Sequence, residues 1–406
     1  MAVGLDKLPE LHPVDGIRLG TTCAGISQPD RRDLVVIELA EGAHTAAVFT
    51  RNAFCAAPVI VARQHLNKKM PRMLVINTGN ANAGTGASGI LDAASVCDSL
   101  SRLAGCQSDE ILPFSTGVIG EALPISEINA ALSKAYDDLN PAGWIDAASG
   151  IMTTDTVPKG VSCQFELKGR TVTLTGIVKG AGMIRPDMAT MLAFITTDAA
   201  VSSSVLQTAL GSAVTKSFNR ITVDGDTSTN DACLLMATGK CSGAVIDTLD
   251  DEDYSIFLDK VTEVCKLLAQ AIVRDGEGAT KFVTIKVNGA ESATMCDQVA
   301  YNIAHSPLVK TALFASDPNW GRILAVVGRS GIPVDAIEQV SIFLDNVCIV
   351  RNGGKADDYQ EAQGQKVMQQ DELCIRVDLG QGDRSTEIWT TDLSYDYVKI
   401  NAEYRT

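Results

Sequence analysis

Residues 172–198 constrain the fold of this chain more than any other segment. A strand-like apolar run at 172–178 enters the glycine-rich turn Lys179-Gly180-Ala181-Gly182, and a second buried-looking run follows at 191–196. The glycines at 180 and 182 allow the chain to bend sharply between the two runs. The residues alone leave two interpretations open. Either this is a structural turn after which Thr190 begins a strand, or it is a constrained bend that presents a hydroxyl group for chemistry.

The composition is that of an ordinary globular protein. With 406 residues, of which 46% are hydrophobic, the chain can bury a large core, and about two or three lobes are expected. The net charge of -15 offers no basic surface to nucleic acid. Asp6 and Lys7 interrupt the apolar run that a signal peptide needs, and no stretch of about 18 apolar residues occurs. We therefore expect a cytoplasmic protein without nucleic-acid or membrane partners.

The periodicity of apolar residues predicts a mixed α/β (α+β) fold. Strand-like runs at 34–37 and 73–76 accompany helical stretches in the first half, and Ser126 is expected to cap a helix that extends to Leu139. In the second half an amphipathic helix covers 257–272 and stops at Gly276. The segments 282–289, 340–350 and 372–391 are each interpreted as a β-hairpin, which predicts an antiparallel sheet.

Two polar motifs suggest ligands but fit them poorly. Residues 84–89 match G-x-G-x-x-G, yet seven residues separate the first glycine from the preceding strand-like run, so a plain turn is favoured over a nicotinamide or flavin site. Residues 224–231 begin like a calcium loop, but Thr229 replaces its glycine and Leu235 its glutamate. This second motif predicts a polar turn near a ligand, and no metal site is expected.

The segment 179–198 resembles the cleavage region of the ornithine acetyltransferases, an arginine-biosynthesis family whose members process themselves at an Ala-Thr bond. Arg185-Pro186-Asp187 carries more charge than we expect before that bond. Further family-like blocks occur in order along nearly the whole chain: Thr78-Gly79-Asn80-Ala81-Asn82-Ala83, Ser115-Thr116-Gly117-Val118-Ile119-Gly120, Met152-Thr153-Thr154-Asp155-Thr156, Arg274-Asp275-Gly276-Glu277-Gly278, Asp317-Pro318-Asn319-Trp320-Gly321 and Asn401-Ala402-Glu403-Tyr404. The resemblance implies an ornithine acetyltransferase-like N-terminal-nucleophile fold with layered sheets and flanking helices.

The resemblance also implies a reaction. Autoproteolysis between Ala189 and Thr190 gives an alpha chain, 1–189, and a beta chain, 190–406, that begins with the nucleophile Thr190. The new α-amino group, with a pKa of about 7.7–8.0, then serves as the base for the Thr190 hydroxyl. The acetyl group passes from N-acetyl-L-ornithine to Thr190 and on to L-glutamate, so ping-pong kinetics are expected.

The remaining site residues follow from the same resemblance. Thr116 and Gly117 are expected to form the oxyanion hole, although without the resemblance they indicate only a turn. The expected substrate-binding residues are Thr153, Lys179, Thr190, Glu277, Asn401 and Thr406. The alternation of Leu393, Tyr395 and Tyr397 predicts a strand that carries the C-terminal tail inward.

The remaining expectations concern the assembly of the protein and its alternative functions. The two chains are expected to stay interleaved and to assemble as an α2β2 heterotetramer, with no cofactor. Whether acetyl-CoA also serves as an acetyl donor is left open. The alternatives are an aminopeptidase-like hydrolase on the same scaffold, a dinucleotide-dependent oxidoreductase that uses residues 84–89, and a non-catalytic amino-acid-binding protein.

Overall fold

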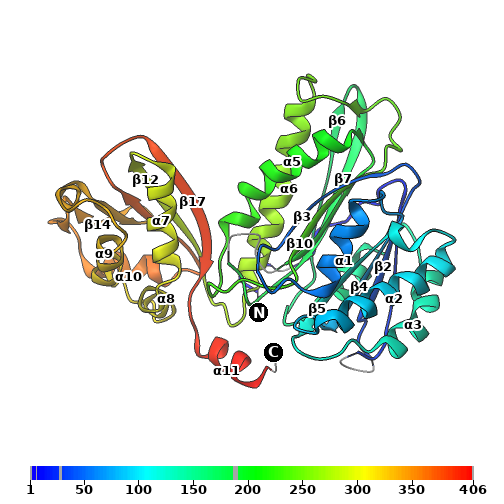
Figure 1. Cartoon of the computed structure of the whole chain (residues 1–406). Helices are drawn as coiled ribbons and strands as arrows, with labels where there is room; N and C mark the ends of the chain where they lie inside the picture. Colours follow the sequence, from blue (N-terminus) through cyan, green and yellow to red (C-terminus); the bar gives the residue numbers. More distant parts are fainter. Residues whose placement is uncertain (1, 6, 27–29, 186–190, 405–406) are drawn as a thin grey trace. The chain divides into compact units, whose positions relative to one another are not determined.

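The chain divides into two compact units. In the computed structural model, residues 2–5, 7–26, 30–185 and 191–404 are described. The larger unit comprises residues 7–219 and 226–272, and the smaller comprises 220–225 and 273–404 with the first few residues of the chain. The expected mixed α/β class with layered sheets and flanking helices is confirmed (Figure 1).

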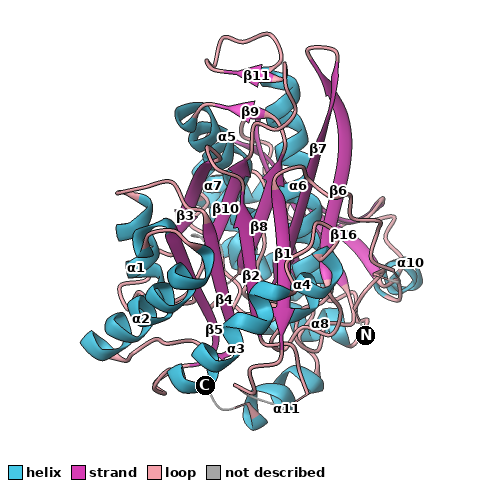
Figure 2. Ribbon diagram, turned by 90° about the vertical axis from the view of Figure 1, so that its right-hand side faces the viewer, coloured by secondary structure: helices cyan, strands magenta, loops and turns pink. Residues whose placement is uncertain are grey.

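Two sheets face each other in the larger unit (Figure 2). Sheet I has the order β1-β2-β4-β5, and sheet II has the order β3-β10-β8-β7-β6. The strands of sheet I are β1 (Ile17–Thr22), β2 (Leu34–Leu39), β4 (Met73–Asn80) and β5 (Ile111–Val118). Those of sheet II are β3 (His44–Phe49), β6 (Lys159–Leu167), β7 (Arg170–Lys179), β8 (Leu192–Thr197) and β10 (Ala232–Ala237). A short pair of strands is formed by β9 (Ala200–Val201) and β11 (Val245–Ile246).

Helices cover the outer faces of both sheets. Of the helices on sheet I, α2 (Gly86–Ala104) and α3 (Ile125–Asp137) cover the face, and α1 (Ala57–Leu66) packs along β5. On sheet II, α5 (Ser203–Thr215) packs against β3 and β10, and α6 (Tyr254–Arg274) brings Leu268 against Gly176 of β7. The helix expected at 257–272 is confirmed; it ends at Arg274, ahead of Gly276.

The apolar runs seen in the sequence are strands that are buried on both faces. In β2, Val35 and Ile37 join the core between the two sheets, whereas Leu34 and Val36 join the core under the helices. Side chains of a strand alternate between its faces, so a strand covered on both sides needs a continuous apolar run. The prediction of strands at 34–37, 73–76, 172–178 and 191–196 is confirmed.

Helix α3 begins two residues earlier than Ser126 suggested. Its N-cap is Pro124, and the Ser126 hydroxyl donates to the Glu127 carboxylate at 2.5 Å instead of capping the helix. The apolar positions Ile128, Leu132 and Ala135 are buried as expected. The helix ends at Asp137, so Leu139 lies beyond it.

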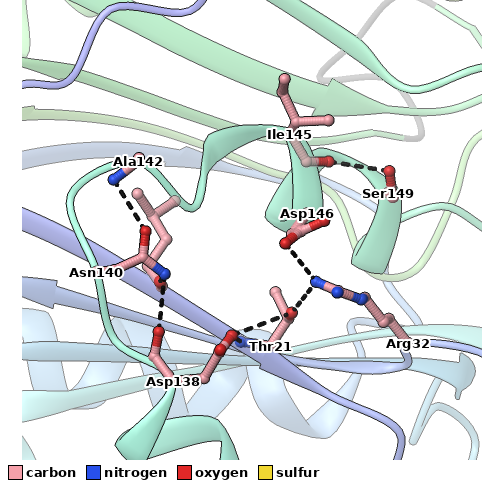
Figure 3. Close-up of polar contacts among 9 residues, drawn as sticks. Thr21, Arg32, Asp138, Asn140, Ala142, Ile145, Asp146 and Ser149 are labelled. Carbon is pink, nitrogen blue, oxygen red and sulfur yellow. Dashed lines mark hydrogen bonds and ion pairs between the residues drawn. The ribbon is translucent and has the colours of Figure 1, made fainter.

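A polar network fixes the segment after α3 to sheet I (Figure 3). The Asp138 carboxylate accepts the Thr21 N–H at 2.9 Å, and Arg32 donates to the Thr21 hydroxyl at 2.7 Å while pairing with Asp146 at 2.6 Å. Asp146 belongs to α4 (Trp144–Gly150), whose buried Trp144 packs in the core between the sheets. These contacts fix the position of α4, from which the chain continues to Thr153.

The smaller unit is built on one mixed sheet with the order β15-β14-β13-β16-β12-β17. Its strands are β12 (Phe282–Ala290), β13 (Ser341–Leu344), β14 (Val347–Arg351), β15 (Gly354–Lys355), β16 (Glu372–Asp378) and β17 (Arg384–Thr391). Helix α7 (Ala293–Ala304) packs on β12 and β17, with α8 (Pro307–Phe314), α9 (Trp320–Gly328) and α10 (Glu361–Met368) beside this sheet (Figure 1).

Only one of the three expected hairpins is confirmed. β13 and β14 form the hairpin around Asp345-Asn346. β12 runs into α7 instead of a returning strand, and it lies between β16 and β17, so these two strands do not pair with each other. β12 is parallel to β16 and antiparallel to β17, which corrects the expected antiparallel sheet.

The expected strand at the C-terminus is wrong. Residues Tyr395–Glu403 form helix α11, and the Ser394 hydroxyl caps it by accepting the Tyr397 N–H at 3.3 Å. A serine ahead of an Asp in the first turn is a helix-start signal, and it outweighs the short alternation of Leu393, Tyr395 and Tyr397.

Candidate active site

Thr116 and Gly117 lie where β5 ends beside β4. Thr116 is opposite Thr78 and Gly117 is opposite Gly79 in the parallel pairing. Gly117 has a φ of +139°, and a Cβ there would lie 2.3 Å from the carbonyl carbon of Gly79. The close approach of the two strands therefore admits only glycine at position 117. The Thr116 side chain is buried at the same point.

Buried amide side chains hold the loop that follows β4. The Asn77 side chain donates to the Asn80 carbonyl at 2.9 Å and accepts the Ser115 hydroxyl at 2.5 Å. The Asn80 side chain in turn accepts the Asn82 N–H at 2.8 Å. These bonds satisfy buried polar groups within the chain itself, and they fix the end of β4 against the end of β5.

The glycine-rich segment at 84–89 is explained by the same loop. Gly84 and Gly86 have positive φ values, and a Cβ at Gly89 would lie 1.9 Å from the Thr85 hydroxyl. The Asn82 side chain donates to the Gly89 carbonyl at 2.9 Å and accepts the Thr85 hydroxyl at 2.8 Å. The glycines are thus accounted for by turn conformation and close packing, which favours the plain turn.

The polar turn at 228–231 connects β5 to β8. The Asn230 side chain donates to the carbonyls of Ser115 and Ala81 at 2.8 and 2.6 Å. The neighbouring Asp231 carboxyl accepts the N–H of Met191 at 2.9 Å. Two hydrogen bonds, from the adjacent residues Asn230 and Asp231, therefore connect the strand end that carries Thr116 to the residue directly after Thr190.

Asp155 joins three parts of the larger unit. Its carboxylate accepts the N–H groups of Thr153 and Gly180 at 2.9 and 2.7 Å and pairs with the Lys159 ammonium at 2.6 Å. Burial by itself would raise the pKa of Asp155. The positive charges of Lys159 and Lys179 and the Gly180 N–H outweigh burial, and they hold this pKa well below its usual range.

Lys179 is a buried lysine at the end of β7, opposite Leu192 of β8. Its charge acts on two carboxyl groups, Asp155 and Asp231, and favours the ionised form of each. For Asp231 burial is the larger effect, and it raises the pKa of that carboxyl well above its usual range. The two carboxyl groups around Lys179 therefore have opposite protonation preferences.

The predicted site residues fall into three groups. Thr116, Gly117, Thr153 and Lys179 all lie in the larger unit. Glu277 and Asn401 lie in the smaller unit, where the Asn401 side chain donates to the Glu277 carboxylate at 2.8 Å. Ala189, Thr190 and Thr406 lie outside the described residues.

Sequence reasoning did not single out Asp155, Lys159, Asn230 and Asp231 as site residues. All four are buried polar residues. Three of them lie inside segments that the sequence had marked: Asp155 in a family-like block, and Asn230 and Asp231 in the polar turn. A marked segment rich in charged and amide residues was therefore the available signal.

Within the described ranges, no cluster of three or more histidine, cysteine, aspartate or glutamate residues is arranged to hold a metal ion. Among those same residues, no helix combines the length and apolar character needed to cross a membrane.

Comparison with known proteins decides the family. The model of the ArgJ family matches residues 18–406. The chain belongs to the ArgJ family. The arginine biosynthesis bifunctional proteins ArgJ of Pseudomonas fluorescens and Pseudomonas syringae pv. tomato are 58% and 57% identical to it, each over 406 residues and the full length of both chains. A crystal structure of the Bacillus halodurans protein of that name is 38% identical, covers 52% of this chain and 97% of its own, and gives a TM-score of 0.48.

Family membership confirms the reaction class expected from the sequence. This ArgJ-family chain is an enzyme of arginine biosynthesis, an acyltransferase with the glutamate N-acetyltransferase function. The full-length match favours this function over the aminopeptidase-like hydrolase and the dinucleotide-dependent oxidoreductase.

Proposed function

We propose that this chain cleaves itself before Thr190 and then transfers acetyl groups from N-acetyl-L-ornithine to L-glutamate through that residue. One observation carries the proposal. The adjacent residues Asn230 and Asp231 are hydrogen-bonded to Ser115 and to Met191, respectively, and so form a path between these two residues. This path connects the expected oxyanion donors to the residue next to the expected nucleophile, as the reaction requires.

Cleavage makes the nucleophile competent. The Thr190 hydroxyl attacks the carbonyl carbon of Ala189, the bond from that carbon to the Thr190 nitrogen breaks, and an ester forms. Water then hydrolyses the ester, which leaves a carboxylate on Ala189 and a free amine and hydroxyl on Thr190. The α-amine is the base that threonine, a weak nucleophile, otherwise lacks.

Acetyl transfer then takes place in two steps. The Thr190 oxygen attacks the acetyl carbon of N-acetylornithine, ornithine leaves with the proton that the α-amine had accepted, and an acetyl ester remains on Thr190. The amine of glutamate attacks this ester, which releases N-acetylglutamate and restores the hydroxyl. The Thr116 hydroxyl and the Gly117 N–H are the proposed donors to the oxyanion in both steps.

Substrate binding rests on charge. The ammonium of Lys179 suits the α-carboxylate of either amino acid, and its burial beside Asp155 supports a fixed position. Thr153 is proposed as a second ligand because Asp155 holds its N–H. The family resemblance supports Glu277 as the ligand of the substrate ammonium, with Asn401 and Thr406 from the C-terminal tail.

The proposal also includes cofactor use and subunit assembly. We expect no cofactor, with acetyl-CoA as an additional acetyl donor where the chain is bifunctional. An α2β2 assembly in the cytoplasm is expected from the same resemblance and from the sequence.

Intact-mass spectrometry under denaturing conditions tests the proposal. The purified protein should give two pieces, 1–189 and 190–406, and incubation with N-acetylornithine should add about 42 Da to the second piece as an acetyl ester. Thr190→Ala, the control, should stay whole and unmodified. A single unmodified chain recovered from active protein would overturn the mechanism.

A further inference from the structure

Glu277 lies in a tight turn of the smaller unit. The Ala279 N–H closes this turn by donating to the Gly276 carbonyl at 2.9 Å. Gly278 follows Glu277 with a φ of +68°, and a β-turn with a positive φ at its third residue favours glycine there. The turn therefore has a defined shape, and its orientation is set by the segments that hold its two ends.

Asp392 holds the residues that follow this turn. Its Oδ1 accepts the N–H groups of Thr280 and Lys281 at 2.8 and 2.9 Å, and its Oδ2 accepts the Thr280 hydroxyl at 2.6 Å. Asp392 is 4% exposed. Hydrogen bonds to a carboxylate are stronger than those to a neutral acceptor, and burial shields them from water. One buried side chain therefore fixes the end of the turn with both of its oxygens.

The sheet of the smaller unit places Asp392 beside the turn. β17 pairs with β12 as far as Thr391, which lies opposite Phe282. Asp392 is the residue after Thr391 and Lys281 is the residue before Phe282, so the carboxylate extends the contact between the two strands beyond their last pair. Lys310 of α8 fixes the same strand end, because its ammonium donates to the Thr391 carbonyl.

The segment after Asp392 returns to the same turn. The Ser394 hydroxyl donates to the Gly278 carbonyl at 2.6 Å, and the Asn401 side chain of α11 donates to the Glu277 carboxylate at 2.8 Å. Asp392 therefore lies between the two parts of the smaller unit that carry expected substrate ligands, the turn with Glu277 and the helix with Asn401.

We propose that Asp392 is a positioning residue that fixes the Glu277 carboxylate for the ammonium of the acetyl donor, and so makes the enzyme select donors with a positively charged side chain. The inference rests on the proposed function, in which Glu277 is the ligand of that ammonium. N-acetyl-L-ornithine carries its free amino group at the end of its side chain, because its α-nitrogen is acetylated. A carboxylate that is already held in place loses less freedom when it pairs with this ammonium, and it therefore binds the ammonium more tightly.

The test compares two acetyl donors by the rate at which N-acetylglutamate forms. N-acetyl-L-norvaline has the carbon chain of N-acetyl-L-ornithine without the terminal amino group, so it cannot pair with Glu277. Asp392→Ala removes three hydrogen bonds, and it should lower kcat/KM for N-acetylornithine by about tenfold or more relative to N-acetylnorvaline. The loss should lie in KM with kcat nearly unchanged, because the ammonium is bound alike in the substrate and in the transition state. An equal loss for both donors would overturn the proposal, since it would indicate a general structural defect.

Asp345→Asn is the matched control. Asp345, in the hairpin of β13 and β14, also accepts a backbone N–H, that of Cys374, at 2.8 Å. β16 and β12 separate β13 from β17 in the sheet, so this variant should leave the preference for N-acetylornithine unchanged. Asp392→Asn keeps an oxygen for the N–H groups of Thr280 and Lys281, and it should retain most of the preference.

Thr280→Val decides the question if Asp392→Ala does not fold. Valine removes the hydroxyl that donates to Asp392 and keeps the backbone N–H of residue 280. This variant should lower the preference for N-acetylornithine in the same direction by a smaller factor. An unchanged preference in Thr280→Val would then overturn the proposal.

Glu277→Gln separates this inference from the proposed function. It should reduce the preference for N-acetylornithine at least as much as Asp392→Ala does. If Glu277→Gln loses the preference and Asp392→Ala keeps it, the role of Asp392 is overturned and the proposed function stands. If Glu277→Gln keeps the preference, Glu277 is not the ligand of the ammonium, and that part of the proposed function fails together with the role of Asp392.

Discussion

At the scale of single residues, the Asp155 carboxylate is the counter-ion of Lys159, a lysine that is 2% exposed. Asp155→Asn removes the negative charge and leaves this buried ammonium without its carboxylate counter-ion, which typically costs about 3–5 kcal/mol. We expect a loss of that order in the free energy of unfolding, measured by urea denaturation at pH 7. Asp251→Asn, which breaks a surface ion pair with Lys168, should have a far smaller effect.

The lowered pKa of Asp155 predicts that the stability of the protein depends on pH. The pKa of Asp155 is lower in the folded than in the unfolded chain, so its contribution to stability is present above the unfolded pKa of about 3.9 and is lost as pH falls below it. The difference in unfolding free energy between the wild type and Asp155→Asn should therefore shrink as the pH falls from about 5 to about 2. A constant difference in unfolding free energy over this range would contradict the assignment.

Substitution of Gly117 tests its expected role in the oxyanion hole. In Gly117→Ala the new methyl group would meet the Gly79 backbone, and the positive φ is strained for alanine. The strand ends must then separate, which displaces the Gly117 N–H. We expect kcat to fall by about 100-fold or more, the effect of losing one such donor.

Gly120→Ala provides the comparison for this change. Gly120 also has a positive φ, but nothing lies within 4 Å of its added Cβ. It should lower stability through backbone strain with little change in kcat. Equal losses of kcat in the two variants would show that position 117 has no special role.

The sequence revealed some site residues and not others. Lys179, Thr116 and Gly117 could be named because they lie in blocks that resemble a known family. Asp155 and Asp231 could not, because an aspartate in a polar turn is exposed by default, and only the fold buries these two beside Lys179.

At the scale of elements, local patterns predicted strands well and pairings poorly. Runs of apolar residues identified β2, β4, β7 and β8 because both faces of these strands are covered. The partner of a strand depends on contacts far away in the sequence. β16 and β17 follow each other closely in the chain, yet β12 lies between them, and nothing in residues 372–391 encodes this insertion.

Helix α11 depends on its cap more than on packing. None of its residues is buried, and the Ser394 hydroxyl both accepts the Tyr397 N–H and donates to the Gly278 carbonyl at 2.6 Å. Ser394→Ala should cost about 1 kcal/mol locally. The expected result is faster hydrogen exchange in α11 and a higher KM, because Asn401 contacts Glu277 from this helix.

Ser292→Ala is the control, since Ser292 caps α7 in the same way through the Met295 N–H. It should leave exchange in α11 unchanged. If Ser394→Ala also leaves α11 protected, then packing and not the cap holds the helix.

At the scale of the whole molecule, the proposed cleavage divides a sheet without dividing the fold. The order of sheet II is β3-β10-β8-β7-β6, in which β3, β6 and β7 precede residue 190 and β8 and β10 follow it. β8 pairs with β7 over Val178↔Ala193 and Lys179↔Leu192, and β10 pairs with β3. Each piece therefore supplies strands that the other must complete.

Because the strands of the two pieces alternate in sheet II, we expect the pieces to stay associated after cleavage. The 1–189 and 190–406 pieces should elute together in gel filtration and unfold in urea in a single transition, because neither can bury its strands of sheet II alone. Thr190→Ala, which should stay whole, gives the reference profile. The pieces should separate only once the sheet has unfolded, since the backbone hydrogen bonds across β7 and β8 are buried and have no water to replace them. Elution of free 1–189 under native conditions would mean that the contacts of β8 with β7 are too weak to hold the nucleophile in place.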